Sequence, residues 1–263
     1  MRCPQVTIAA AALFALASPG LGRPAIADTS SSRVLIVTGE DKHHDWRRTT
    51  PVLVELLHGD PRLRVDVLSD LASLRTIDLK SYDVVVIHFK NERPAVPGRD
   101  AFDHLQRYVT DGGGLVLVHF GCGAFQEFKF DYAELVGRVW FGLKPPPGRR
   151  QHDPRGPFLV NVANRSHPIT AGMEDFDTDD ELYTCLEGEA PIEVIATAKS
   201  KVDGDVHPMA FLYQGGKGRV FTCTLGHDVR ALQFDEVSEL YRRGAAWSAG
   251  LSPVPEDKSA AKQ

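Results

Sequence analysis

The feature that most constrains the fold is a five-residue run, Leu115–His119, which is apolar until its final histidine. The glycine-rich segments Asp111–Gly114 and Gly121–Gly123 lie on either side of it. A short apolar run between turn residues is typical of a β-strand buried on both faces. Such strands belong to parallel sheets covered by helices, and these sheets bind ligands beyond the carboxyl ends of their strands. We therefore expect His119 at a ligand-binding edge.

Similar apolar runs alternate with helical patterns along the first half of the chain. One helix is expected to begin at Thr49 or Thr50, and Arg99–Thr110 has the spacing of a second amphipathic helix. The order of strands and helices predicts one α/β domain with a doubly wound, mostly parallel sheet flanked by helices. Strands are predicted at 33–38, 62–68, 84–88, 115–119, 158–162, 193–198, 207–213 and 219–225, the last two forming a hairpin, with further helices at 132–136 and 234–246.

The first 27 residues have the character of a secretory signal peptide. Arg2 supplies a positive start, Val6–Ala17 is apolar, and Ala25–Ala27 has the small residues of a cleavage site. The apolar run is too short to span a membrane comfortably. We expect export to the periplasm or the medium, no membrane association after cleavage, a folded domain over 28–251, and a disordered tail over 252–263.

Composition excludes several classes of protein. The formal net charge of -5 and the lack of a basic run argue against a nucleic-acid partner. After signal cleavage three cysteines remain, Cys122, Cys185 and Cys223, without CxxC spacing. This pattern excludes a zinc ribbon and argues against a disulfide framework, although one bridge stays open. The chain also lacks a Walker loop, an HExxH motif and a GxSxG elbow.

Polar residues follow four predicted strands at the point where each strand ends. The four segments are Thr38–Glu40, His88–Asn91, His119–Gly123 and Gly226–Asp228. Because the carboxyl ends of parallel strands meet at one edge of a sheet, we expect these segments to face one crevice. Histidine transfers protons near neutral pH, and two or three histidines with a carboxylate can bind zinc or a similar ion.

Each candidate also has a structural alternative. A strand-end histidine such as His119 can be a core residue bonded to a backbone carbonyl. Asp179–Glu181 fits a solvated turn as well as a catalytic acid or base. Cys122 could be a nucleophile with His227 as its base. The interpretation that we favour for Cys122 is a small residue in a tight turn.

With these residues identified, the chain resembles the ThuA-like, or trehalose-utilisation, family. The matching pieces keep the family's order and cover nearly everything after the signal peptide. They are Val34–Thr38 with the loop His44–Arg47, Tyr82–Val86, Gly112–His119, Leu135–Gly137, Ser166–Thr170, Asp180–Tyr183, His207–Ala210, and Gly216–Val220 through Leu225–His227.

The resemblance implies a fold related to class I glutamine amidotransferases and a role in bacterial sugar catabolism, with oxidised (3-keto) glycosides as the substrate class. The family residues that carry over are His119, Asp180, Glu181 and His227, together with His44. An ammonia-releasing glutaminase is not implied. Here Asp228 and Val229 replace the Pro-Glu that follows the catalytic histidine in amidotransferases, and Cys122 lies beyond the usual nucleophile position.

Taken together, these features predict an exported enzyme that acts on a keto glycoside, such as oxidised trehalose, by acid/base chemistry. The alternatives are a carbohydrate-binding module without turnover and a cysteine hydrolase. The particular sugar, the reaction type and a homo-oligomeric state stay open. The candidate catalytic residues are His119, His227, Glu181 and Asp180; the candidate substrate-binding residues are His44, Asp45, His88, Asn91, Gly121 and Cys122; and His119 and His227 are candidate ligands of a divalent metal, zinc or manganese.

Overall fold

The computed structural model describes residues 31–91, 96–140 and 151–255. The predicted signal peptide, residues 141–150 and most of the predicted tail lie outside these ranges. The molecule is built on a nine-stranded sheet in the order β2-β1-β3-β4-β11-β10-β9-β6-β7. One half of this sheet is parallel and the other half is antiparallel.

The parallel half consists of β2, β1, β3, β4 and β11, and it matches the predicted strands closely. β3 and β4 are buried at every position, because helices cover both faces of the sheet. In β1, Val34 and Ile36 pack into the core on one face, and Leu35 and Val37 pack into the core on the other. The bounds are β1 Ser32–Thr38, β2 Leu63–Leu68, β3 Val84–His88, β4 Gly114–Val118 and β11 Gly218–Cys223.

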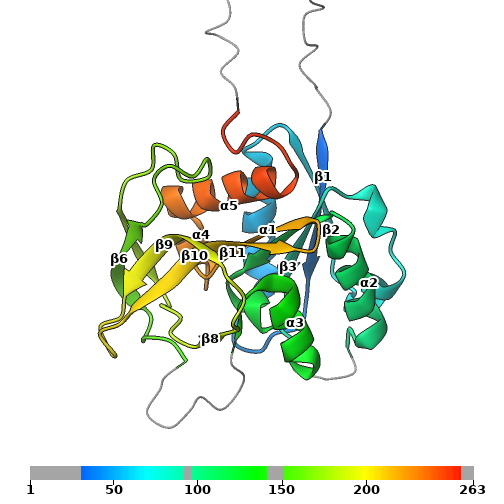
Figure 1. Ribbon diagram of the computed structural model, residues 1–263, viewed down its shortest axis with the longest axis horizontal. Coiled ribbons are helices and arrows are strands. Elements are labelled where there is room, and N and C mark those ends of the chain that lie inside the picture. Colours follow the sequence, from blue (N-terminus) through cyan, green and yellow to red (C-terminus); the bar gives the residue numbers. More distant parts are fainter. Residues whose placement is uncertain (1–30, 92–95, 141–150, 256–263) are drawn as a thin grey trace, which may run out of the picture.

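The helices form one layer on each face of the sheet, as Figure 1 shows. Helices α1 (Trp46–His58) and α5 (Asp235–Ser248) pack on the first face, with the short α4 (Val229–Leu232) beside them. Helices α2 (Arg99–Thr110) and α3 (Lys129–Val136) cover the second face. Short 3-10 turns and a small two-stranded sheet complete the connections: η1 Leu71–Arg75, η2 Leu79–Ser81, η3 His119–Gly123, η4 Gln126–Phe128, β5 Val139–Trp140 and β8 Leu186–Glu187.

The start of α1 differs from the prediction. The helix begins at Trp46, so Thr49 and Thr50 lie within it and do not cap it. Their hydroxyl groups donate hydrogen bonds to the carbonyl oxygens of Asp45 and Trp46, one helical turn earlier. Threonine is favoured at helix starts because it bonds to the backbone, and here the same ability is used inside the helix.

The antiparallel half extends well beyond the predicted hairpin. It consists of β10 (Val206–Gly215), β9 (Glu193–Lys199), β6 (Gly156–Val162) and β7 (Phe176–Asp180). The last strand, β7, includes Asp179 and Asp180 of the acidic segment Asp179–Glu181. A solvated turn was one of the two predictions for this segment. The fold class is confirmed, because the sheet remains a single α/β layer between helices.

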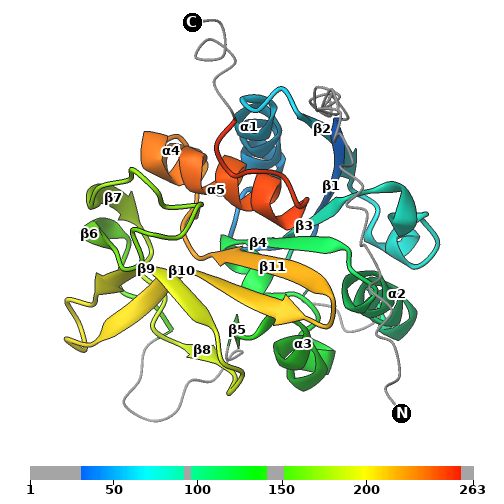
Figure 2. The ribbon, with the colours of Figure 1, turned by 45° about the horizontal axis from the view of Figure 1, so that its top comes forward.

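The antiparallel half curls back toward the carboxyl ends of the parallel strands. In a flat sheet, β7 would lie about 19 Å from β11, since strands are spaced about 4.8 Å apart. Yet Asp180, at the end of β7, accepts a hydrogen bond of 2.6 Å from the backbone N–H of Gly226, just after β11. Register shifts between β10 and β9 near Pro208 and Ala210 are consistent with this bending. Figure 2 shows β7 beside α4.

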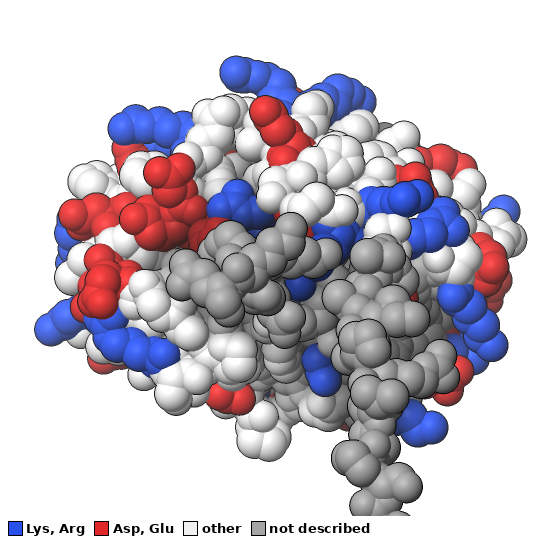
Figure 3. Space-filling view, turned by 90° about the horizontal axis from the view of Figure 1, so that it is seen from above, with Lys and Arg blue, Asp and Glu red and all other residues white. Residues whose placement is uncertain are grey.

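Other predictions concern the surface and the cysteines. On the face shown in Figure 3, side chains of both charges occur among uncharged ones, and several acidic side chains are grouped at the left. Cys122, Cys185 and Cys223 are buried, and no disulfide joins them. Among the described residues, no helix combines the length and the apolar character needed to cross a bilayer.

Candidate active site

His119 lies where the chain turns sharply away from the central strand β4. Its φ of 42° is left-handed, which is uncommon for a residue with a Cβ. Gly121 permits the turn, because a Cβ there would lie 2.3 Å from the carbonyl oxygen of Ile87. Backbone strain of this kind often accompanies a functional site.

Four side chains from separate loops converge at this point. His44 follows β1, His119 follows β4, Glu181 follows β7 and His227 follows β11. One ligand atom from each side chain lies within 4.8 Å of the others. Glu181 Oε2 is 3.6 Å from His119 Nε2 and 3.2 Å from His227 Nδ1. The curled sheet therefore brings the predicted His119, His227 and Glu181 together, and His44 joins them. We call these four residues the histidine cluster.

Hydrogen bonds fix the orientation of two imidazoles in the histidine cluster. His119 Nδ1 donates to the carbonyl oxygen of Thr224 at 2.6 Å, which leaves Nε2 as the acceptor nitrogen. The hydroxyl of Tyr183 donates to this Nε2 at 3.0 Å. The Asp41 carboxylate holds His44 Nδ1 at 2.9 Å, which leaves Nε2 as the acceptor nitrogen of this ring. Contacts of this kind set the tautomer of metal-binding and catalytic histidines.

Asp180 supports the cluster from behind. It is completely buried, and its carboxylate accepts hydrogen bonds from the backbone N–H groups of Gly226, His227 and Glu181. Burial raises its pKa. Since its oxygens are occupied by the backbone, the structure assigns Asp180 a positioning role, which corrects the prediction that it is catalytic.

The charge states within the cluster differ from one group to the next. Burial lowers the pKa values of His44 and His119, which favours their neutral forms. Burial would raise the pKa of Glu181, but His119 and His227 outweigh it and hold that pKa well below its ordinary value. Burial also opposes a charge on His227, yet contact with Glu181 prevails and raises its pKa. The cluster thus combines an ionised carboxylate, a readily protonated imidazole and two neutral imidazoles.

A pocket of about 250 Å³ opens in front of the cluster. His119 is completely buried beneath this pocket, whereas the other three cluster residues line it. Sequence reasoning missed Tyr183 and His152 as site residues. In the structure an isolated β-bridge pairs these two residues. His152 lies in a proline-rich stretch with no periodic signal, whereas Tyr183 lies two residues after the acidic segment Asp179–Glu181. The pocket is lined by His43, His44, Lys90, Trp140, Gln151, His152, Glu181, Tyr183 and His227.

Two predicted substrate-binding residues belong to the core instead. His88 is completely buried, and its ring nitrogens bond to the hydroxyl groups of threonines, at 3.0 Å from Thr38 and 3.2 Å from Thr49. Burial lowers the pKa of His88 to about 3. The buried Asn91 side chain donates to Glu127 and accepts from the backbone of Phe125. Both side chains are satisfied within the protein, so neither is available to a ligand.

Three further predictions also fail on geometry. Asp45 is exposed at the start of α1 and lines a different pocket, beside α4. Gly121 has no side chain, and the backbone of β3 packs tightly against it. Cys122 is completely buried, and burial raises the pKa of its thiol far above the ordinary value. A protonated thiol without access to solvent cannot be a nucleophile, which argues against the cysteine hydrolase.

The residues of the histidine cluster fit a divalent metal ion. Three imidazoles and a carboxylate form a donor set that suits zinc and manganese. His44 Nε2 and His227 Nδ1 are buried, and neither has a hydrogen-bond partner in the described part of the chain. Glu181 lies near His227 Nδ1 but is not aligned for a hydrogen bond. Buried polar atoms without partners are costly, and a bound ion would satisfy both.

Comparisons with known proteins agree on the fold. A ThuA-like protein from Parabacteroides merdae has a TM-score of 0.75 and 22% sequence identity, covering 87% of this chain and 94% of that chain. A ThuA-like protein from Bacteroides uniformis has a TM-score of 0.64 and 20% identity, covering 90% and 98%. A protein from Thermoplasma acidophilum that is described as part of a GMP synthase has a TM-score of 0.50 and 11% identity, covering 83% and 95%. At these identities the likeness shows the fold alone.

The family assignment comes from the sequence pattern itself. No curated protein matches the chain. The family model for ThuA, described as trehalose utilisation, matches residues 33–248. This range contains every residue of the histidine cluster and nearly all of the described domain. The chain therefore belongs to the ThuA family.

Proposed function

We propose that this ThuA-family protein is an enzyme that acts on an oxidised (keto) glycoside, and that the histidine cluster binds a divalent metal ion in its active site. The observation that carries this proposal is the convergence of His44, His119, Glu181 and His227, with their ligand atoms within 4.8 Å of one another. Four loops far apart in the sequence supply these side chains, and two of the imidazole nitrogens have no hydrogen-bond partner within the described residues. An arrangement needed only for stability would satisfy its buried polar atoms.

The keto group determines which chemistry the residues must perform. A ketone next to the glycosidic carbon acidifies the adjacent C–H bond, so a positioned base can remove that proton and start an elimination or an isomerisation. Negative charge then develops on the ketone oxygen and must be stabilised. A divalent ion, when bound, supplies a Lewis acid for this oxygen.

The side chains of the pocket have distinct roles in this scheme. The imidazoles of His44 and His227 would hold the ion. His119 would join them through Nε2 in place of its hydrogen bond from the Tyr183 hydroxyl. Glu181 is the ionised carboxylate that accepts the proton or a sugar hydroxyl group. Burial raises the pKa of Tyr183, so its hydroxyl keeps its proton at neutral pH and can donate a hydrogen bond to the developing charge.

The test is incubation of the purified protein with 3-keto-trehalose and related oxidised glycosides, with and without added zinc or manganese, followed by mass spectrometry of the products. We expect turnover that depends on the metal and on Glu181. Unchanged substrate under all conditions would overturn the enzymatic proposal. Binding of the sugar by calorimetry without any product would instead favour a carbohydrate-binding module.

We also propose that the protein is exported, on the basis of the signal-peptide pattern in residues 1–27. Export would place the enzyme where glycosides arrive before uptake. N-terminal sequencing of the protein recovered from the periplasm or the medium should begin at Asp28. Recovery of the uncleaved chain from the cytoplasm alone would refute the proposal.

A further inference from the structure

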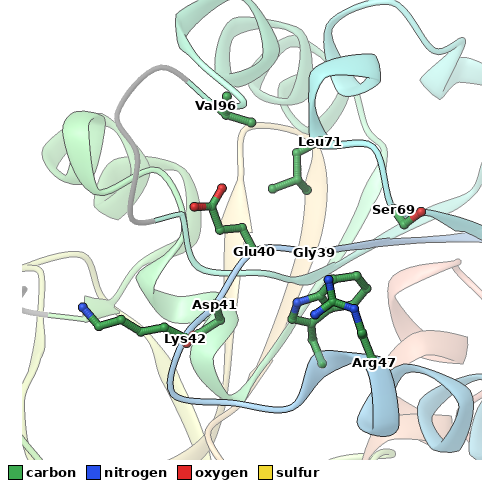
Figure 4. Close-up of a pocket in the computed structure, with 9 residues that line it drawn as sticks. Gly39, Glu40, Asp41, Lys42, Arg47, Ser69, Leu71 and Val96 are labelled. Carbon is green, nitrogen blue, oxygen red and sulfur yellow. The ribbon is translucent and has the colours of Figure 1, made fainter.

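A second pocket, of about 410 Å³, lies beside the histidine cluster at the same edge of the sheet. Segments that follow β1, β2 and β3 form its walls. In the view of Figure 4, Leu71 and Val96 lie on one side of the backbone at Gly39–Asp41, and Arg47 lies on the other. No predicted site residue lines this pocket.

The loop after β1 connects the two pockets. Asp41 and Lys42 line the second pocket, and His43 and His44 line the histidine pocket. The fully buried carboxylate of Asp41 holds His44 Nδ1 at 2.9 Å. A group bound in the second pocket would therefore rest against the loop that positions one member of the cluster.

The sizes of the pockets indicate how a ligand could be divided between them. Pockets for small molecules usually measure about 300–1,000 Å³. The histidine pocket, at about 250 Å³, is below this range, whereas the second pocket, at about 410 Å³, is within it. A glycosidic bond joins two rings directly, so a ring that reacts at the cluster must place its partner close by. Consecutive residues of one loop line the two pockets, so the pockets are neighbours.

The lining of the second pocket favours a neutral ligand with many hydroxyl groups. Glu40 and the basic residues Lys42 and Arg47 lie along it, and the carboxylate of Asp41 is buried beside it, so neither an anion nor a cation finds a uniform field. The half-buried indole of Trp46 lines the pocket with apolar surface, and the Arg47 guanidinium covers one face of its ring, 4.3 Å from the centroid. A sugar ring presents C–H groups to an aromatic face and hydroxyl groups to charged side chains.

We propose that the second pocket is the subsite for the ring that does not react, and that Trp46 makes the protein selective for disaccharides over simple alkyl glycosides. This inference rests on the proposed function for the identity of the reacting ring. The presence of a sugar subsite is a separate claim that binding alone can test.

The experiment compares Trp46→Ala with a matched control, Trp247→Ala, in the full-length protein. Trp247 is also half-buried with an arginine over its ring, but it lies on α5, outside the second pocket. Calorimetry with trehalose measures binding, and steady-state kinetics compares 3-keto-trehalose with methyl 3-keto-glucoside. Circular dichroism melts check the fold, and Trp46→Phe tests whether an aromatic face restores the effect.

We expect Trp46→Ala to weaken trehalose binding about tenfold and to lower the ratio of kcat/KM for the disaccharide over the methyl glycoside by a similar factor. Trp46→Phe should retain most of both values, and Trp247→Ala should change neither. A wild-type ratio in Trp46→Ala with turnover intact would overturn the subsite and leave the proposed function standing. If neither substrate is turned over, the proposed function fails. The calorimetry with trehalose then decides by itself whether the second pocket is a sugar subsite. Loss of trehalose binding in Trp46→Ala but not in Trp247→Ala supports the subsite. Equal binding by the wild type and Trp46→Ala, or no binding by either, overturns it.

Discussion

Two histidines at the ends of neighbouring strands, His88 on β3 and His119 after β4, have opposite surroundings. Both are completely buried. Hydroxyl groups of Thr38, Thr49 and Thr50 occupy both ring nitrogens of His88. His119 instead has its Nε2 directed at Tyr183 and Glu181, close to two further imidazole rings.

The contrast teaches that a strand end does not by itself make a histidine functional. The groups that decide the role come from other parts of the chain. For His88 they are β1 and helix α1, which are packed in the core. For His119 they are the segments after β7 and β11, which meet only because the antiparallel half of the sheet curls back. Four predictions can break or sharpen this comparison.

The largest effect is expected from Glu181→Gln, which keeps the size of the side chain and removes its charge. We predict a loss of about 10²–10⁴-fold in turnover of the keto glycoside, the usual contribution of a positioned acid or base. Steady-state kinetics on the purified variant measures it. His88→Asn is the control on the core side and should stay within a few-fold of wild type. Equal losses in both variants would erase the distinction between the two regions.

Asp180→Ala tests the contact that closes the curled sheet. Removing the carboxylate leaves buried backbone N–H groups without an acceptor, so we predict a loss of about 3 kcal/mol in the free energy of unfolding. Urea denaturation measures it. Asp179→Ala is the matched control, because the neighbouring carboxylate only pairs with the arginines Arg155 and Arg230 and should cost about 1 kcal/mol or less. Similar losses for the two variants would contradict the positioning role.

His88→Asn should alter the acid sensitivity of the fold. The pKa of folded His88 is about 3, below the ordinary value of 6.5, so between these values the unfolded chain binds a proton that the folded chain does not. Wild-type stability should therefore fall with decreasing pH, by up to about 1.4 kcal/mol per unit from this residue. Urea unfolding between about pH 7.5 and about pH 5.5, a unit on each side of the ordinary pKa, should show a shallower slope in the variant. Identical slopes would mean that His88 is not buried in its neutral form.

The smallest effect is expected from Cys122→Ala. Because the thiol is buried and protonated, turnover should remain within about twofold of wild type, and only a modest loss of stability should follow. Activity assays and thermal melts separate the two quantities. A folded but inactive variant would restore the cysteine hydrolase as the leading function.

The regular part of the fold could be predicted from the sequence because burial on both faces leaves a clear apolar pattern. The helix Arg99–Thr110 and the strand Val84–His88 were predicted with the bounds that the structure has. The acidic end of β7 was harder to predict, because the sequence of a strand with polar residues at a curled edge resembles that of a turn.

The candidate site was only partly predictable for the same reason. Strand-end position selected His119 and His227, which the structure brings into the cluster, but it selected His88 and Asn91 equally well, since the local pattern is the same. What separates them is the set of partners supplied from a distance, such as Thr49 for His88 and Tyr183 for His119. Those partners depend on the curl of the sheet and on the early start of α1, neither of which leaves a periodic signal.

The most direct test of the central claim, that His44, His119 and His227 bind one metal ion beside the carboxylate of Glu181, is calorimetric titration of the chelator-treated protein with zinc and manganese. We predict one ion per chain, with affinity weakened by about a hundredfold or more in His227→Ala and unchanged in His88→Asn. No binding by the wild type, or undiminished binding by His227→Ala, would contradict it.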